Sequence, residues 1–279
     1  MPLISPAELQ EHQARNACVV VDCRFKLGEP ASGRQAWADA HVPGARYAHL
    51  DEDLAAPVGE QGGRHPLPEA DQFARLLARW GVQPHHLVVA YDDAGGAIAG
   101  RLWWLLRHFG HEQAAVLDGG FAAWQAAGLP VEKQPPDVHE APLRELYPGR
   151  MPVIDAHELI DRLQAESIVL IDVRDGQRFA GAVEPLDRVA GHVPGAVNLP
   201  LTGNVDAAGR FLAPQALRER FQSIIGPRPV AEVALMCGSG VSACQSLVAM
   251  EHAGLAGATL YAGSWSDWIS DADRPVAKL

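Results

Sequence analysis

The chain of 279 residues contains the same series of motifs twice, and this repetition constrains its fold more than any other feature. Four blocks recur in the same order: CVVVDCR (18–24) with VLIDVR (169–174), HVPGA at 41–45 and 192–196, LVVAYDDAGG (87–96) with EVALMCGSGV (232–241), and DGGFAAW (118–124) with YAGSWSDW (261–268). The separation between the copies is nearly constant. The sequence therefore indicates a duplicated domain.

Within each half, short runs of β-branched residues alternate with amphipathic helical patterns. The expected strands are 18–22, 87–91, 114–118, 168–172, 232–236 and 258–261, and the expected helices include 69–80, 98–109, 214–224 and 242–252. This alternation predicts an α/β protein with two tandem domains, each a mostly parallel sheet flanked by helices. A proline-rich, aperiodic linker at 131–150 is expected to separate domain 1–130 from domain 151–279.

Composition narrows the classes of partner. A net charge of −11 argues against nucleic acid and anionic membranes as partners, and it requires a local positive site for any anionic substrate. Four cysteines are too few for a disulfide scaffold, and neither a signal peptide nor an apolar run of membrane-spanning length is visible. We therefore expect a cytoplasmic protein.

The two copies differ in one loop, where CGSGVSAC (237–244) places Cys237 opposite Asp92 of the first copy. Residues that both copies share, such as the two HVPGA segments, are expected to serve the fold. A reactive residue present in one copy alone is the better candidate for chemistry. The second domain is therefore expected to be catalytic and the first inactive.

Cys237 follows an expected strand and precedes an expected helix, at the edge of a parallel sheet where ligands bind. Gly238 and Gly240 allow successive backbone N–H groups to converge, and Ser239 and Ser242 add hydroxyl donors. Such a loop at a helix N-terminus favours a reactive thiolate. The alternative is a buried structural cysteine beside a glycine turn, which is the commoner environment of a single cysteine.

Two other cysteine chemistries fit less well. A zinc site needs four ligands, and no second Cys/His pair is placed to complete one around Cys237 and Cys244. A cysteine phosphatase needs an arginine six residues after the nucleophile to bind phosphate, and this sequence has Ala243 there. We expect neither a metal nor a cofactor.

These motifs resemble the rhodanese superfamily, and specifically its tandem-domain sulfurtransferases, over nearly the whole chain. The resemblance is carried by the two HVPGA segments, by YAGSWSDW, and by the six-residue loop at 237–242. The loop sequence CGSGVS is similar to the 3-mercaptopyruvate sulfurtransferase type, because the basic residues typical of thiosulfate-preferring relatives are absent. The resemblance implies two rhodanese-like domains, of which the first is inactive.

The resemblance also implies a mechanism. Cys237 would take a sulfur atom from 3-mercaptopyruvate as a persulfide, held by the backbone of Gly238, Gly240, Val241 and Ser242. A thiol such as thioredoxin, or cyanide, would then accept that sulfur. Two alternatives stay open: a thiosulfate:cyanide sulfurtransferase, and a non-catalytic sulfur-carrying or regulatory module.

Further site residues follow from the same resemblance. Arg178 matches one of two substrate-binding arginines, whereas Leu186 stands where the second is expected, with Arg188 two residues later. Ser239 would form a proton relay with His65 and Asp51. A solvated loop histidine is the alternative interpretation of His65.

Overall fold

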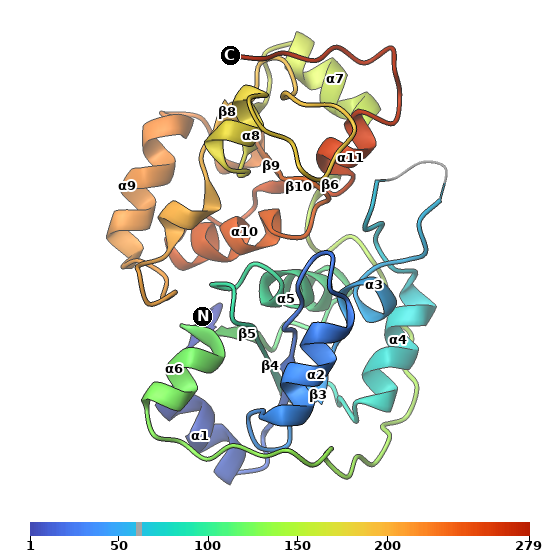
Figure 1. Ribbon diagram of the computed structural model, residues 1–279, viewed down its shortest axis with the longest axis vertical. Helices are drawn as coiled ribbons and strands as arrows, with labels where there is room; N and C mark the ends of the chain where they lie inside the picture. The colour runs from blue at the N-terminus through green and yellow to red at the C-terminus, as the bar shows by residue number, and fades with distance from the viewer. Residues whose placement is uncertain (60–62) are drawn as a thin grey trace. The chain divides into compact units, whose positions relative to one another are not determined.

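The structure is a computed structural model that describes residues 1–59 and 63–279 (Figure 1). The chain forms two compact units. The first comprises Met1–Ala56, Leu67–Arg150 and Val205–Phe211, and the second comprises Pro57–Pro66, Met151–Asn204 and Leu212–Leu279. Each half of the sequence thus contributes a short segment to the unit formed mainly by the other half.

The first unit is a five-stranded parallel sheet with the strand order β1-β5-β4-β2-β3. Its strands are β1 (Leu3–Ile4), β2 (Cys18–Asp22), β3 (Arg46–Tyr47), β4 (Leu87–Tyr91) and β5 (Ala114–Leu117). Its helices are α1 (Pro6–Ala14), α2 (Ala31–Asp39), α3 (Leu50–Asp53), α4 (Ala70–Arg79), α5 (Ala99–His108) and α6 (Gly120–Ala126). Leu9 of α1 and Trp124 of α6 pack on the sheet residues Val20 and Val89. Helix α5 packs against β4 and β5.

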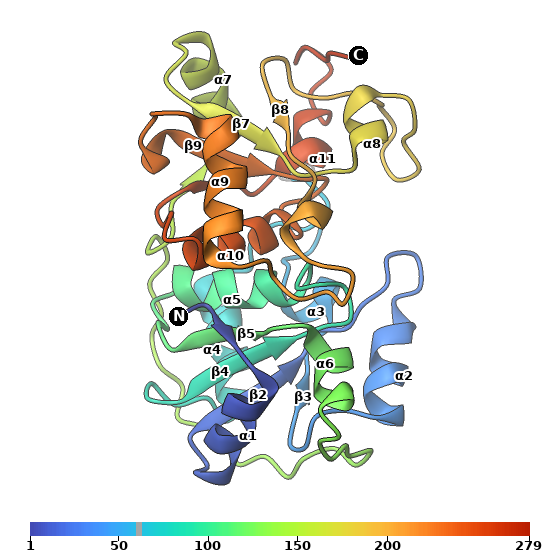
Figure 2. The ribbon, with the colours of Figure 1, turned by 90° about the vertical axis from the view of Figure 1, so that its left-hand side faces the viewer.

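The second unit repeats this plan with the strand order β6-β10-β9-β7-β8, again entirely parallel (Figure 2). Its strands are β6 (Val153–Ile154), β7 (Val169–Asp172), β8 (Val197–Asn198), β9 (Val233–Met236) and β10 (Thr259–Tyr261). Its α-helices are α7 (Ala156–Gln164), α8 (Gly176–Ala180), α9 (Pro214–Ile225), α10 (Ala243–His252) and α11 (Ser264–Trp268). Leu159 and Trp265 pack with Leu170 and Met236 in its core. The predicted α/β fold with two tandem parallel-sheet domains is confirmed.

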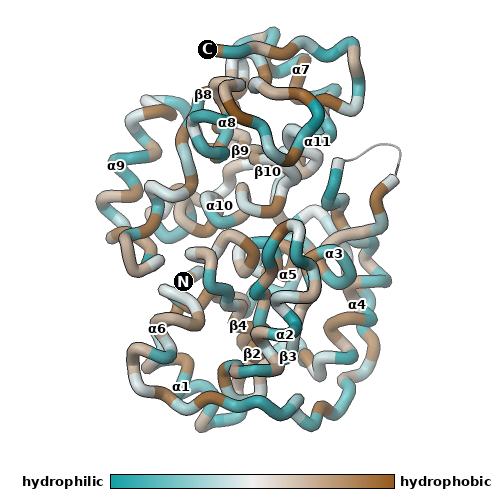
Figure 3. The backbone as a smooth tube through the Cα atoms, viewed as in Figure 1, coloured by the Kyte–Doolittle hydropathy of each residue, from teal (hydrophilic) through white to brown (hydrophobic). Residues whose placement is uncertain are grey.

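Helix α4 illustrates why the spacing of apolar residues in the sequence predicts the helices. Phe73, Leu76 and Leu77 recur at helical spacing and are buried, whereas Asp71 and Arg75 are exposed. Figure 3 shows the corresponding alternation of hydrophobic and hydrophilic colour along α4. Burial of one apolar stripe fixes which side of this helix faces the interior of the first unit.

The shared Asp-x-Arg motifs are buried ion pairs at the ends of equivalent strands. Arg24 binds the Asp22 carboxylate through Nε at 3.0 Å and Nη2 at 2.5 Å, and Nη2 also donates to the carbonyl of Ala40. Arg174 binds Asp172 and the carbonyl of Gly191 in the same way. Each arginine therefore ties the end of a central strand to the segment that leads into HVPGA, which is a structural role.

The two HVPGA histidines also serve the fold. His41 Nδ1 lies 2.7 Å from the carbonyl oxygen of Trp37 and its ring stacks on that indole, and His192 makes the same two contacts with Phe179. Both histidines thereby fix the helix that precedes their turn.

Among the described residues, no helix has both the length and the apolarity needed to span a membrane.

Breaking one of these ion pairs should be costly because it leaves a charge buried without its partner. We expect Arg24→Met to lower the free energy of unfolding by about 3–5 kcal/mol. Lys26→Met removes the exposed pair with Glu29 and should cost less than about 1 kcal/mol. Urea unfolding of both variants measures the difference, and equal effects would contradict the structural role of Arg24.

Candidate active site

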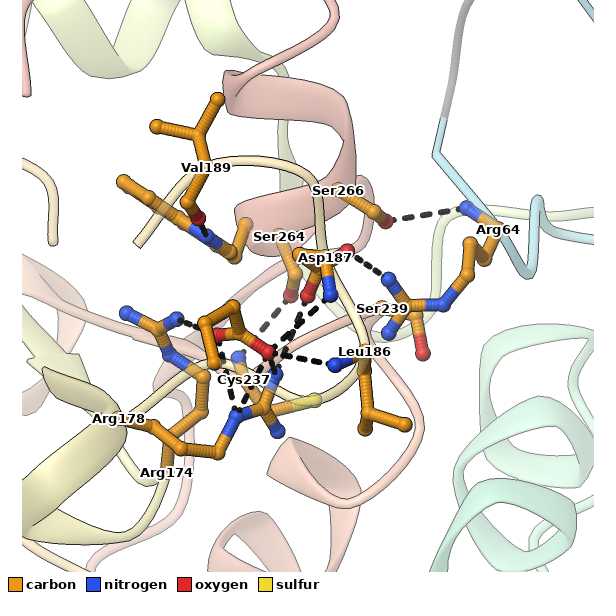
Figure 4. Close-up of polar contacts among 12 residues, drawn as sticks. Arg64, Arg174, Arg178, Leu186, Asp187, Val189, Cys237, Ser239, Ser264 and Ser266 are labelled. Carbon is orange, nitrogen blue, oxygen red and sulfur yellow. Dashed lines mark hydrogen bonds and ion pairs between the residues drawn. The ribbon is translucent and has the colours of Figure 1, made fainter. Parts of the chain in front are cut away.

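Cys237 lies directly after β9, and its side chain is buried at the start of the loop that leads into α10. Its N–H donates to Ser264 Oγ at 3.1 Å, and its carbonyl accepts from the N–H of Trp265 at 3.1 Å. The carbonyl of Gly238 accepts from the N–H of Ser266 at 2.9 Å. The YAGSWSDW segment therefore holds the start of the loop from its backbone side (Figure 4).

Gly240 lets the loop curl. Its φ of +73° lies in the left-handed region, and a Cβ at this position would lie 2.1 Å from the carbonyl oxygen of Ala262. No side chain fits there without moving the backbone. Val241 and Ser242 complete the loop, with Val241 buried and Ser242 half-buried.

The loop of the first unit shows what this backbone geometry binds. Asp92 occupies the position of Cys237, and its carboxylate accepts four backbone hydrogen bonds of 2.8–2.9 Å. The donors are the N–H groups of Ala94, Gly96, Ile98 and Ala99. A loop of this kind thus concentrates N–H groups on one anionic side chain at a helix N-terminus.

The structure brings Ser239 and His65 together. Ser239 Oγ lies 2.7 Å from His65 Nδ1, and both side chains are buried. His65 belongs to the segment Pro57–Pro66, which is part of the second unit. The alternative of a solvated loop histidine is therefore wrong. Asp51 lies in α3 of the first unit, and its place in a proton relay stays a prediction.

Arg178, which projects from α8, lies over the loop. A Cβ placed on Gly238 would lie 3.6 Å from Nη2 and 3.8 Å from Nη1 of this guanidinium group. The same group binds the Glu184 carboxylate through Nε and Nη2, and Nη2 also lies 3.1 Å from Asp187 Oδ2. A cation is therefore present one residue from Cys237.

Arg188 is held elsewhere. Its Nη2 donates to the carbonyl oxygens of Ile269 and Ser270, just after α11, and these contacts give no support to the predicted role in substrate binding. Helix termini leave carbonyl groups without intrahelical partners, and an arginine satisfies them well. Leu186, where the second arginine was expected, is partly exposed.

Arg64 is a cation of this site that the sequence reasoning missed. Its Nη1 pairs with Asp187 Oδ1, and its backbone N–H donates to Ser266 Oγ at 3.0 Å. A Cβ on Gly238 would lie 3.1 Å from Arg64 Nη2. The available signal was its place immediately before His65 in the segment GGRHPLP.

Two buried carboxylates neutralise these arginines, and they differ in how firmly they hold their charge. Burial alone would raise the pKa of Glu184, but hydrogen bonds from Arg178 and from the N–H groups of Leu186 and Asp187 outweigh it and lower the pKa. Burial raises the pKa of Asp187, although Arg64 and Arg178 oppose this shift. Asp187 is therefore the carboxylate that is more readily protonated.

Among the described residues, no cluster of His, Cys, Asp and Glu is arranged to bind a metal ion.

The fold and the loop agree with the comparisons with known proteins. The family described as "Rhodanese-like domain" matches residues 5–127 and 155–271, so the chain belongs to the rhodanese family.

Three relatives place it more narrowly. A probable 3-mercaptopyruvate sulfurtransferase of Pseudomonas aeruginosa is 43% identical over 99% of this chain and 97% of the relative. A putative thiosulfate sulfurtransferase of Mycobacterium tuberculosis is 36% identical over 99% of this chain and 96% of the relative. The solved structure of 3-mercaptopyruvate sulfurtransferase from Leishmania major has a TM-score of 0.84 and 31% identity, covering 98% of this chain and 75% of that one. The chain is therefore an enzyme of the sulfurtransferase class.

The loop geometry predicts that Gly240→Ala abolishes activity and destabilises the second unit, because the added Cβ meets the Ala262 carbonyl. Gly226→Ala is the matched control, since its φ is +62° but its Cβ would meet no atom within 4 Å. Its φ of +62° and ψ of −136° lie in a region nearly restricted to glycine, so backbone strain alone should cost it about 1–3 kcal/mol, with activity retained. Thermal unfolding and turnover distinguish the two, and an active Gly240→Ala variant would rule out the proposed loop constraint.

Proposed function

We propose that the protein transfers a sulfur atom from 3-mercaptopyruvate to a thiol or cyanide acceptor through a persulfide on Cys237. The observation that carries this proposal is the occupied loop of the first unit. There, four backbone N–H groups bind an anionic group at the end of the Asp92 side chain.

A cysteine persulfide has the same chain length as an aspartate. Its outer sulfur is the third heavy atom from Cα, as are the carboxylate oxygens of Asp92, and the S–S bond adds about 2 Å to the cysteine. In the described part of the second unit, the N–H groups of Ser239, Val241 and Ala243 donate no hydrogen bond. They correspond to three of the four donors to Asp92. This correspondence supports a loop that accepts the outer, anionic sulfur.

The first half-reaction is a nucleophilic displacement at sulfur. The Cys237 thiolate attacks the sulfur of 3-mercaptopyruvate, so that an Sγ–S bond forms and the bond from that sulfur to C3 breaks. The electron pair of the broken bond leaves on the organic fragment as the enolate of pyruvate. Addition of a proton at C3 completes pyruvate, and the hydrogen-bonded pair of Ser239 and His65 would deliver that proton.

The second half-reaction restores the enzyme. An acceptor nucleophile, which is a small thiol, thioredoxin or cyanide, attacks the outer sulfur and releases the Cys237 thiolate. Four free cysteine thiols support a reducing compartment such as the cytoplasm, where thiol acceptors are available.

The charge around the loop favours the mercaptopyruvate donor over thiosulfate. Arg178 offers a guanidinium group to a carboxylate beside Cys237, whereas the loop itself contains no basic residue. Thiosulfate is the second candidate donor, because the Mycobacterium tuberculosis relative carries that name. Comparing kcat/KM for the two donors with cyanide as acceptor tests the choice, and faster use of thiosulfate would contradict it.

Persulfide formation should depend on Cys237 alone. After incubation with 3-mercaptopyruvate, the intact mass should rise by about 32 Da in the wild type and in Cys18→Ser, and not in Cys237→Ser. Cys18 is the control because it lies in β2 of the first unit. Turnover by Cys237→Ser would overturn the mechanism, and the absence of any adduct in an inactive wild type would favour a non-catalytic module.

Ser239 and His65 should act as one unit. We expect Ser239→Ala and His65→Gln each to lower kcat about 10–100-fold with little change in KM, because proton delivery to the enolate is impaired. The double variant should lose no more than either single variant. Steady-state kinetics of the four proteins test this, and losses that multiply would show that the two residues act independently.

A further inference from the structure

The guanidinium groups of Arg64 and Arg178 lie beside the cysteine loop, and each has N–H groups that donate no hydrogen bond. In the described part of the chain, Arg178 Nη1 and Arg64 Nη2 donate no hydrogen bond, and Arg64 Nε is buried without a partner. Both groups lie within 4 Å of a Cβ placed on Gly238, the residue after the nucleophile. Figure 4 shows Arg64 and Arg178 on either side of Asp187 near Cys237. Both guanidinium groups therefore lie beside the residue that follows the nucleophile, with N–H groups available to an anionic ligand.

The space between the two cations holds one side-chain carboxylate. Asp187 contacts Arg64 through Oδ1 and Arg178 through Oδ2, so a single carboxylate bridges the two guanidinium groups. This is the geometry by which paired arginines bind a carboxylate ligand. In this structure the carboxylate bound by the two arginines is the side chain of Asp187.

Asp187 is held less firmly than its neighbour Glu184. The Glu184 carboxylate accepts from Arg178, from Arg174 and from two backbone N–H groups. In the described part of the chain, only the two guanidinium groups donate to the Asp187 carboxylate. Exchange of Asp187 for another carboxylate would therefore leave the rest of the charge network in place.

We propose that Arg64 is the second substrate-binding cation of this enzyme, and that the carboxylate of the sulfur donor takes the place between Arg64 and Arg178 that Asp187 now occupies. The inference rests on the proposed function and names the class of donor, a monocarboxylate with its sulfur within reach of Cys237. Arg64 thereby supplies the charge that is missing at Leu186.

Charge balance supports an exchange. Arg64, Arg174 and Arg178 are matched by Asp172, Glu184 and Asp187, so the ligand-free network is neutral. Binding an additional anion to a neutral, largely buried network is unfavourable. When Asp187 leaves the pair, the network gains one positive charge, which a monocarboxylate neutralises. A dianion such as thiosulfate would leave it negative.

The test compares steady-state kinetics with 3-mercaptopyruvate for Arg64→Gln, Arg188→Gln and Arg75→Gln. Arg64→Gln should raise KM about 10–100-fold, the loss expected for a charge-assisted hydrogen-bonded contact, with kcat changed less than about 3-fold. Arg188→Gln competes directly for the role of second cation. Arg75→Gln, at an exposed position of α4, controls for a general loss of positive charge and should match the wild type.

Asp187→Asn supplies a second, opposite readout. It should lower KM for 3-mercaptopyruvate several-fold, since the donor no longer displaces a bound carboxylate, whereas a purely structural Asp187 would give a higher KM. An unchanged KM in Arg64→Gln, or a raised KM in Arg188→Gln instead, would overturn the inference. A wild type that forms no persulfide and no pyruvate from 3-mercaptopyruvate would instead contradict the proposed function, so the two failures are distinguishable.

Discussion

The convergence of backbone N–H groups at the carboxyl end of a central parallel strand is the interaction on which the site depends. A parallel strand followed by a tight loop and a helix directs several N–H groups at one position, and those groups require an anion or water. In the first unit, Asp92 satisfies them with its own carboxylate. In the second, Cys237 is one atom too short to do so. The same loop backbone thus binds the Asp92 carboxylate in the first unit, and in the second it would bind the outer sulfur of a Cys237 persulfide.

The rest of the second unit keeps this loop in position. Ser264 and the backbone of Trp265 and Ser266 bind its first two residues, and the buried Asp172–Arg174 pair fixes the end of the neighbouring strand β7. Arg174 also lies over the Trp265 ring, with Cζ 4.7 Å from its centre. The buried Asp172–Arg174 pair therefore packs directly against the YAGSWSDW segment. This explains why both copies retain the framework motifs although only one retains the cysteine.

The sequence predicted the architecture well because its information there is local. Strands such as 87–91 are unbroken apolar runs, helices such as 70–79 carry apolar residues at helical spacing, and the duplication supplied a second copy of each motif. The two-residue edge strands and the five-residue helix α8 were not predicted, since such short segments are formed by pairing and packing. Cys237 could be located from the repeat alone, whereas His65 needed the family resemblance.

The charged surroundings of the loop could not be read in the same way. Arg64 belongs to the second unit, although the flanking stretches of sequence, up to Ala56 and from Leu67, belong to the first. Arg188 is close in sequence to the expected position but is bound by carbonyl groups beyond α11. Both outcomes depend on long-range packing, which a motif spacing does not contain.

The most direct measurement is a crystal structure of the protein after incubation with 3-mercaptopyruvate. The account predicts an extra sulfur on Cys237, accepting hydrogen bonds from the N–H groups of Ser239 and Val241, as the carboxylate of Asp92 does from Ala94 and Gly96. An outer sulfur directed away from these N–H groups, or a sulfur carried by another residue, would contradict it.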